Sequence, residues 1–265
     1  MATSLSTELT FDVAANMARQ SLYRFAALSL LDPRAGGWEE LHSLRDQPEL
    51  LTAAAAVLRS EPAAKIETLA HAERPLSSLH PETVLAKLPD SSAALNDEYE
   101  QTFGLLVSNA CPPYETEYIN GKFTFQRSQT LADVGGFYQA FGLMPADRRR
   151  ERPDHITLQL EFMAALLGLE RQAAQSTDPA RRQRVVVCRD AQRKFLHEHL
   201  AWWVPAFCRM LQKENSGGFF EAAGFFLSAL IPAERSLLDV PAPSEHAAPS
   251  TLERPEECEG CALAP

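Results

Sequence analysis

One segment constrains the fold more than any other. Residues 156–170, ITLQLEFMAALLGLE, have the spacing of a helix that is apolar over a wide arc. The large side chains recur every three or four residues in two stripes: Ile156, Leu160, Met163 and Leu167, then Leu158, Phe162, Leu166 and Leu169. Such a helix must be covered by several neighbours. We therefore expect it near the centre of a helical bundle.

The rest of the chain up to about residue 238 also favours helices. They are predicted over residues 11–31, 91–107, about 129–142, about 178–199 and from about 217, with several short ones between 38 and 88. No alternation of period two persists, so strands are not expected. With 265 residues, 45% of them hydrophobic, the chain can bury a core. We expect an all-α protein with a single globular helical domain over residues 1–238.

The composition changes after about Asp239. The remaining residues are mostly Pro, Ser, Ala and Glu, with almost no large apolar side chain. Such a segment buries too little apolar surface to offset the entropy of ordering it. We predict a disordered C-terminal tail over residues 239–265.

Charge, composition and cysteine usage limit the class of protein that this chain can be. The formal net charge is −10, whereas phosphate binding needs a basic surface, so nucleic acid is not an expected partner. The N-terminus lacks the pattern of a secretory signal, and no segment offers the ~18 uncharged apolar residues of a membrane span. The five cysteines, an odd number, do not suggest a disulfide framework. A cytoplasmic protein with reduced thiols is the simplest interpretation.

Sequence patterns typical of catalysis are absent. The chain contains no GxxxxGKS/T or GxGxxG phosphate loop, no GxSxG and no HExxH, so we expect neither enzyme activity nor a bound cofactor. His197 and His199 stand two residues apart and therefore do not share a helix face. Both are expected at the surface near a helix end, where a protonated histidine suits the helix dipole.

The CxxC pair Cys258 and Cys261 is the one candidate for metal or redox chemistry. A structural zinc site needs four ligands, and the tail supplies two, with His246 as a distant third. Three glutamates surround the thiols and favour their protonated form. Two reduced thiols in a flexible tail are the first interpretation. A metal- or redox-active accessory protein that acts through these cysteines is the alternative.

A window without any Lys or Arg runs from Leu88 to Gly121. It contains six acidic residues: Asp90, Asp97, Glu98, Glu100, Glu115 and Glu117. It also contains four aromatic residues: Tyr99, Phe103, Tyr114 and Tyr118. Carboxylates pair with arginine and aromatic rings offer stacking contacts, so the window suits a peptide that is both basic and apolar. The alternative is a solvated helix face beside aromatic residues of the core.

The segment RRRERPDHI, residues 148–156, leads into the central helix. Asp154 can cap the N-terminus of that helix. His155 is expected in the first turn, where the helix dipole disfavours a cation. Its ring should therefore stay neutral and remain available for hydrogen bonding.

Five motifs, in this order, resemble the TorD/DmsD family, which includes NarJ-like members: NDEYEQTFG, CPPYETEY, LADVGGFYQAFGL, ERPDHITLQLEFMAALL and FLHEHLAWWVPAF. The resemblance covers about residues 11–232. The sequences of these motifs are similar to those of chaperones for ethylbenzene dehydrogenase, dimethyl sulfide dehydrogenase and chlorate or selenate reductase. The resemblance implies a helical chaperone, a monomer or homodimer, that binds the leader of a molybdoenzyme catalytic subunit. Such a chaperone assists cofactor insertion and proofreads the subunit before twin-arginine export.

The resemblance also implies a peptide-binding site. The Asp-His pair that the family associates with leader binding corresponds to Asp154 and His155. Pro153 stands one place later than in the family's usual acid-Pro-x-Asp-His pattern. We expect carboxylates of the acidic window to pair with leader arginines and its rings to line an apolar part. The predicted peptide-binding residues are Glu98, Glu100, Phe103, Tyr114, Glu115, Glu117, Tyr118, Asp154 and His155.

Overall fold

The computed structural model describes residues 11–64, 66, 68–104, 110–119, 124–144 and 151–243. Within these ranges the regular structure is helical, and the only β-type pairing is an isolated antiparallel bridge between Tyr114 and His155. The all-α prediction is confirmed. None of the helices in this part of the chain is both long and apolar enough to cross a membrane.

The predicted helical segments all contain helices, with ends displaced by a few residues. The α-helices are α1 (Val13–Ser29), α2 (Trp38–Asp46), α3 (Glu49–Ser60), α4 (Pro81–Leu85), α5 (Ser92–Phe103), α6 (Thr124–Ala140), α7 (Ile156–Gln175), α8 (Arg181–Phe195), α9 (Val204–Glu214) and α10 (Phe219–Leu237). Short 3-10 turns are η1 (Pro33–Ala35), η2 (Pro62–Ala64), η3 (Leu76–Ser78) and η4 (Glu115–Tyr118). The π turn η5 (Leu196–Leu200) continues α8.

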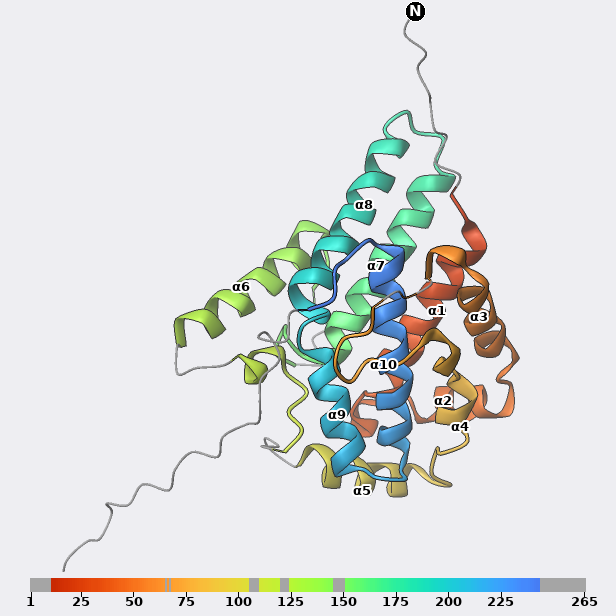
Figure 1. Cartoon of the computed structure of the whole chain (residues 1–265), viewed down its shortest axis with the longest axis vertical. Helices are drawn as coiled ribbons and strands as arrows, with labels where there is room; N and C mark the ends of the chain where they lie inside the picture. The colour runs from red at the N-terminus through yellow and green to blue at the C-terminus, as the bar shows by residue number, and fades with distance from the viewer. Residues whose placement is uncertain are drawn as a thin grey trace, which may run out of the picture.

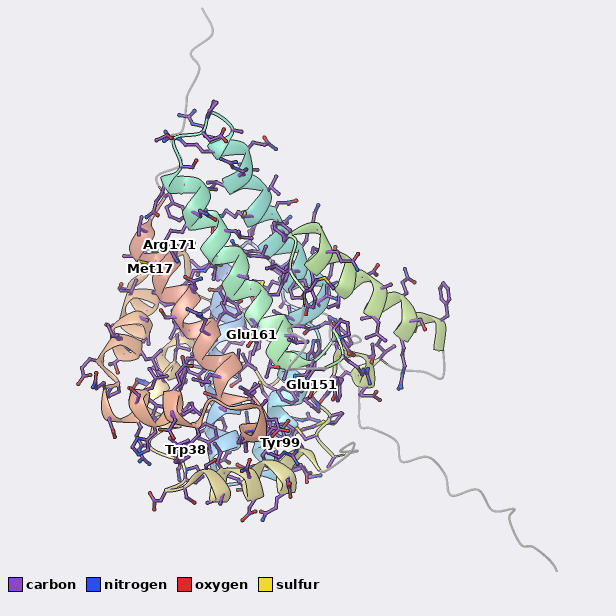
Figure 2. All side chains as sticks on the ribbon, turned by 180° about the vertical axis from the view of Figure 1, so that it is seen from behind. Met17, Trp38, Tyr99, Glu151, Glu161 and Arg171 are labelled. Carbon is purple, nitrogen blue, oxygen red and sulfur yellow. The ribbon has the colours of Figure 1, made fainter. Side chains whose placement is uncertain are left out.

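Two long helices, α7 and α10, form the centre of the bundle (Figure 1). α7 packs against both α1 and α8, as its wide apolar arc predicts. Seen from behind, α1 and α7 run side by side, and Glu161 marks the exposed edge of α7 (Figure 2). α10 packs against α9 and α1 and is buried along nearly its whole length. The central position predicted for α7 is therefore shared with α10, the more enclosed of the two.

α10 accommodates a proline in its interior because another segment satisfies the carbonyl that the proline leaves free. Pro232 has no N–H to donate to the carbonyl of Ser228. The backbone N–H of Arg74 donates to that carbonyl instead, at 2.9 Å. The helix also approaches α9 closely at Gly224, where a Cβ would lie 3.2 Å from the carbonyl oxygen of Cys208. Both contacts fix how α10 sits among its neighbours.

A buried ion pair joins the first and the last of the helices that the structure describes, α1 and α10. Arg19 of α1 donates to Glu234 of α10 through Nε at 2.8 Å and Nη2 at 2.7 Å, and the two side chains are 9% and 0% exposed. Arg19 also donates to Gln192 of α8 at 3.0 Å, and Gln192 donates to Glu170 of α7 at 2.9 Å. One polar network therefore connects α1, α7, α8 and α10 through the core.

The described chain ends at residue 243, shortly after α10. Leu238 and Val240 are still buried in the core. The rest of the predicted tail, with Cys258, Cys261 and His246, lies outside the described residues.

Removal of one partner of the buried pair should be costly. Arg19→Met leaves the Glu234 carboxylate buried and unpaired, so we expect the free energy of unfolding to fall by about 3–5 kcal/mol. The double variant Arg19→Met, Glu234→Met should recover most of that loss because no buried charge remains. Guanidinium unfolding followed by circular dichroism measures both values. Lys194→Met, which breaks the exposed pair with Asp190 on α8, is the control and should cost below about 1 kcal/mol.

An equally unstable double variant would contradict this account of the pair.

Candidate functional site

The loop of residues 110–119 is fixed onto the segment that enters α7. The N–H of Glu115 donates to the carbonyl of Asp154 at 3.0 Å, and the N–H of Ile156 donates to the carbonyl of Pro113 at 2.9 Å. These two hydrogen bonds flank the bridge between Tyr114 and His155. The fold thus brings together the two motifs that the sequence singled out. We call this region the corner: residues 110–119 and 151–156.

The Asp154 carboxylate, 0% exposed, fastens the corner from inside. It accepts hydrogen bonds from the N–H and the hydroxyl of Thr116 at 3.1 and 2.8 Å. It also accepts from Nε and Nη2 of Arg152 at 3.0 and 2.8 Å. A buried carboxylate is tolerated here because these donors, two of them charged, replace its hydration.

The prediction that Asp154 caps α7 is wrong. His155 is the N-cap, since its Nδ1 accepts from the N–H of Thr157 at 3.2 Å. The Asp154 side chain is engaged by Thr116, a residue of the loop that lies far from it in sequence. Local spacing alone favoured the acid as the cap because aspartate is a common N-cap residue.

His155 is buried behind Tyr114. The two rings meet edge to face, with centroids 5.1 Å apart, and the His155 Nδ1 lies 2.7 Å from the hydroxyl oxygen of Thr157. Burial lowers the pKa of His155 from 6.5 to about 4. The ring is therefore neutral near pH 7, which agrees with the prediction from its position at a helix N-terminus.

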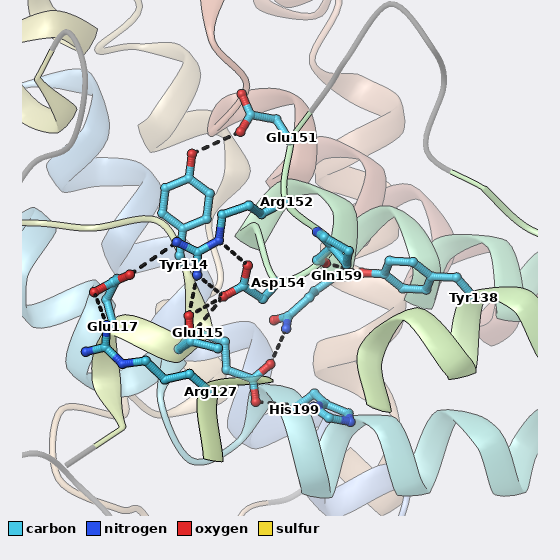
Figure 3. A network of polar contacts seen from close by, with 12 residues as sticks. Tyr114, Glu115, Glu117, Arg127, Tyr138, Glu151, Arg152, Asp154, Gln159 and His199 are labelled. Atoms are coloured by element: carbon cyan, nitrogen blue, oxygen red, sulfur yellow. Dashed lines mark hydrogen bonds and ion pairs between the residues drawn. The ribbon is translucent and has the colours of Figure 1, made fainter. Parts of the chain in front are cut away.

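Tyr114 and Glu117 are two of the partly exposed residues of the corner, and both lie close to Arg152 (Figure 3). The Tyr114 hydroxyl donates to Glu151 at 3.0 Å, and the Arg152 guanidinium lies 4.5 Å from the centre of the Tyr114 ring. Glu117 pairs with both Arg152, at 3.2 Å, and Arg127, at 3.3 Å. These two arginines stand outside the base-free window, so no local pattern indicated that they would pair with one of its acids.

Glu115 points inward. Its carboxylate, in a residue 1% exposed, lies between Gln159 and His199, as Figure 3 shows. Gln159 Nε2 donates to Oε2, while Trp202 Nε1 donates to Oε1 at 3.1 Å. His199 Nδ1 lies 3.2 Å from Oε1. Burial raises the pKa of Glu115, and the hydrogen bonds from His199, Gln159 and Trp202 oppose that effect.

The prediction that His199 lies at the surface is wrong, since it is 4% exposed, whereas His197 is exposed as predicted. His199 follows Phe195 by four residues and so lies on the helix face that α8 buries; the two rings are 5.1 Å apart. This spacing was the signal that could have identified it. The residue lies in the π turn η5, and such turns occur frequently at functional sites.

Two of the predicted aromatic residues are buried in the core. Phe103 packs against Tyr99 and Phe220, with ring centroids 4.7 and 5.2 Å apart. The hydroxyl of Tyr118 donates to the carbonyl of Pro112 at 3.0 Å. Tyr118 therefore braces the loop of the corner, whereas Phe103 packs among aromatic residues outside the corner. Their contact with a peptide stays a prediction.

Two of the predicted acids bind elsewhere in the chain. Glu98 accepts the N–H of Phe219 at 2.6 Å and so complements the positive end of the α10 dipole. Glu100 pairs with Arg34 at 3.1 Å. Neither bonds to a residue of the corner, and their pairing with leader arginines also stays a prediction.

The structure offers no metal site within its described residues. No three His, Cys, Asp or Glu side chains in this part of the chain are placed to hold an ion. Cys111, Cys188 and Cys208 are buried, and burial raises the pKa of each thiol. Burial therefore favours the protonated thiol of all three cysteines near pH 7.

Comparison with known proteins adds a family and several relatives. The family model described as "Nitrate reductase delta subunit" matches residues 62–209, which include the corner. The chain is 35% identical over 120 residues to the "Selenate reductase assembly chaperone protein" of Thauera selenatis, covering 44% of this chain and 57% of that protein. It is 26% identical over 126 residues to the "Chaperone protein TorD" of Photobacterium profundum (48% and 55%).

A third relative is the "Perchlorate reductase assembly chaperone protein" of Dechloromonas aromatica. It is 34% identical over 97 residues, which cover 36% of this chain and 41% of that protein. The chain therefore spans about half the length of the curated relatives that it matches.

The carboxylate of Asp154 can be tested directly. Asp154→Asn removes the charge that holds Thr116 and Arg152, so the free energy of unfolding should fall by about 2–3 kcal/mol. The amide proton of Thr116 should also exchange faster, as measured by hydrogen exchange. Asp178→Asn, at an exposed acid that bonds only local groups, is the matched control and should change neither value by much. Unchanged exchange at Thr116 in Asp154→Asn would refute the fastening role.

The lowered pKa of His155 predicts a pH dependence. The unfolded chain binds a proton on this residue near pH 6.5, whereas the folded chain binds it only near pH 4. Stability from the neutral ring is therefore fully present above about pH 6.5 and is lost as the pH falls toward 4, by at most about 3 kcal/mol. His155→Asn keeps a capping side chain but cannot titrate, so its stability should fall less over this range. Equal pH slopes in urea unfolding would contradict the assignment.

Proposed function

Because this chain belongs to the nitrate reductase delta subunit family, we propose that it is an assembly chaperone for the catalytic subunit of a molybdenum-containing reductase. The assembly chaperones among its relatives, named for selenate and perchlorate reductases, support this proposal. In it, the chain binds the N-terminal leader of the subunit in the cytoplasm, assists cofactor insertion and proofreads the subunit before twin-arginine export. The chain itself catalyses no reaction.

The corner is the surface on which we place the leader. The fold joins there the two motifs that the sequence associated with peptide binding, and the Tyr114 ring and the Glu117 carboxylate reach solvent beside the neutral His155. Asp154 holds this surface rigid through its hydrogen bonds to Thr116 and Arg152. A surface that is already ordered loses little conformational entropy when it binds a peptide. This rigid juxtaposition of motifs is the observation that carries the proposal.

An arginine of the leader can reach Glu117 by exchange. The side chains of its present partners, Arg127 and Arg152, are 42% and 41% exposed. Replacing one exposed ion pair by another costs little free energy because each such pair contributes below about 1 kcal/mol. The formal charge of −10 also speeds the encounter with a basic segment.

A charge reversal at the corner tests the proposal. Glu117→Lys places a cation beside Arg127 and Arg152, so affinity for the leader of the reductase subunit encoded beside this chain should fall at least about tenfold. Calorimetry with the synthetic leader measures the change. Asp190→Lys makes the same change in charge at an exposed position of α8 and should leave affinity within about threefold.

Two outcomes would count against the proposal. Equal losses in the two variants would show a general effect of net charge, which would remove the corner as the binding surface. A wild-type chain that binds no leader and does not co-purify with the subunit would refute the chaperone function itself.

A further inference from the structure

A cavity of about 380 Å³ lies behind the corner, between η4, α6 and the end of η5. η4 contributes Glu115, α6 contributes Gln126, Gln129 and Asp133, and the segment around η5 contributes His199 and Trp202. The volume is near the lower end of the range for ligand pockets, about 300–1,000 Å³. A cavity of this size suits a single long side chain.

The fixed charges of the described residues that line the cavity are all negative. Glu115 lines the cavity, and Asp133 and Glu198 bring two further carboxylates. None of the described residues that line it is Lys or Arg. Arg127 and Arg152, which flank the corner, bind Glu117 instead. A buried carboxylate is costly unless a cation is paired with it, and the raised pKa of Glu115 reflects that cost.

The wall that α6 supplies is polar where a packed helix would be apolar. Gln126, Gln129 and Asp133 recur at spacings of three and four and therefore share one face of the helix. Farther along α6, Val134 and Tyr138 are buried in the core. Figure 1 shows the first half of α6 extending away from the bundle. This half of the helix therefore presents amide and carboxylate oxygens to the cavity.

The polar network around Glu115 is incomplete. In the described structure, Nε2 of His199 and Oε1 of Gln159 are buried and have no hydrogen-bond partner. Both residues bond to Glu115, and His199 also lines the cavity. Buried polar atoms without partners are rare in folded proteins and require an explanation. A ligand that bonds to Glu115 would allow these side chains to rearrange and find partners.

We propose that this cavity binds one guanidinium side chain, with Glu115 as its counter-charge and the Trp202 indole as a wall for stacking. A guanidinium offers five donors in a planar fork, stacks on aromatic rings and is weakly hydrated, whereas an ammonium group is compact and strongly hydrated. A metal ion fits poorly because no three ligating side chains among the described residues are suitably placed. That the guanidinium belongs to an arginine of the leader rests on the proposed function.

The first experiment does not depend on the client. It uses N-acetyl-arginine amide and its neutral isostere N-acetyl-citrulline amide as probes, with NMR of the Trp202 indole N–H, which donates to Glu115. Trp202→Phe assigns the signal. The arginine derivative should shift it with an affinity at least about tenfold above that of citrulline, because a hydrogen bond to a charged group is stronger. Equal shifts from the two probes would overturn the proposal.

Variants locate the probe. Glu115→Gln should abolish the preference for arginine. Because a change at a buried residue can disturb folding, Asp133→Asn and Glu198→Gln, both at exposed acids of the cavity, provide an independent test. Each should weaken arginine binding about threefold or more. Asp190→Asn on α8 is the matched control and should have no effect. Unchanged arginine binding in both rim variants would overturn the assignment.

The second experiment separates the cavity from the chaperone function. Calorimetry compares the leader with a copy in which citrulline replaces each arginine. If the wild-type protein binds the citrulline copy more weakly than the leader, and Glu115→Gln binds the two peptides equally, the cavity is supported as the arginine site. A leader that binds equally well with citrulline refutes this inference and leaves the chaperone function intact. A leader that does not bind, beside a positive result with the amide probe, refutes the chaperone function and leaves the guanidinium site.

Discussion

The buried carboxylate of Asp154 is the interaction on which the rest of the candidate site depends. It holds Thr116 and Arg152 at once, and so connects the loop of residues 110–119 to the entry of α7. That loop has little other regular structure: one isolated bridge and a 3-10 turn. Because Asp154 fixes the loop, the Tyr114 ring stays in contact with His155, and Glu115 stays hydrogen-bonded to Gln159 and His199.

Two carboxylates two residues apart have opposite environments. Glu117 reaches solvent and binds two exposed arginines, so its charge is compensated and its partners can be exchanged. Glu115 is buried among an amide, an indole and an imidazole, and it lines a cavity whose other charged walls are acidic. Glu115 and Glu117 face different sides because both lie in η4, a 3-10 turn with three residues per turn. The surface proposed for a basic segment and the cavity proposed for one cation thus lie next to each other.

The fold class could be predicted from the sequence, but the partners of the side chains in the corner could not. Apolar spacing of three and four residues located the helices, because a helix must bury the stripe that this spacing creates. The separation of His199 from His197 suggests the surface, but His199 follows Phe195 by four residues and shares its buried face. Asp154 has the local position of a helix cap, but its carboxylate binds Thr116, which is not a neighbour in sequence.

By itself, the sequence determined an all-α chain, a base-free window rich in acids and aromatic rings, and an Asp-His pair at the start of the most apolar helix. Only the tertiary structure decided which acids face solvent and which are buried. The donors that hold Glu115 come from Gln159, His199 and Trp202, which are 44, 84 and 87 positions away. A buried carboxylate is stable only where such donors converge, and their convergence depends on how α7 and α8 pack rather than on any local pattern.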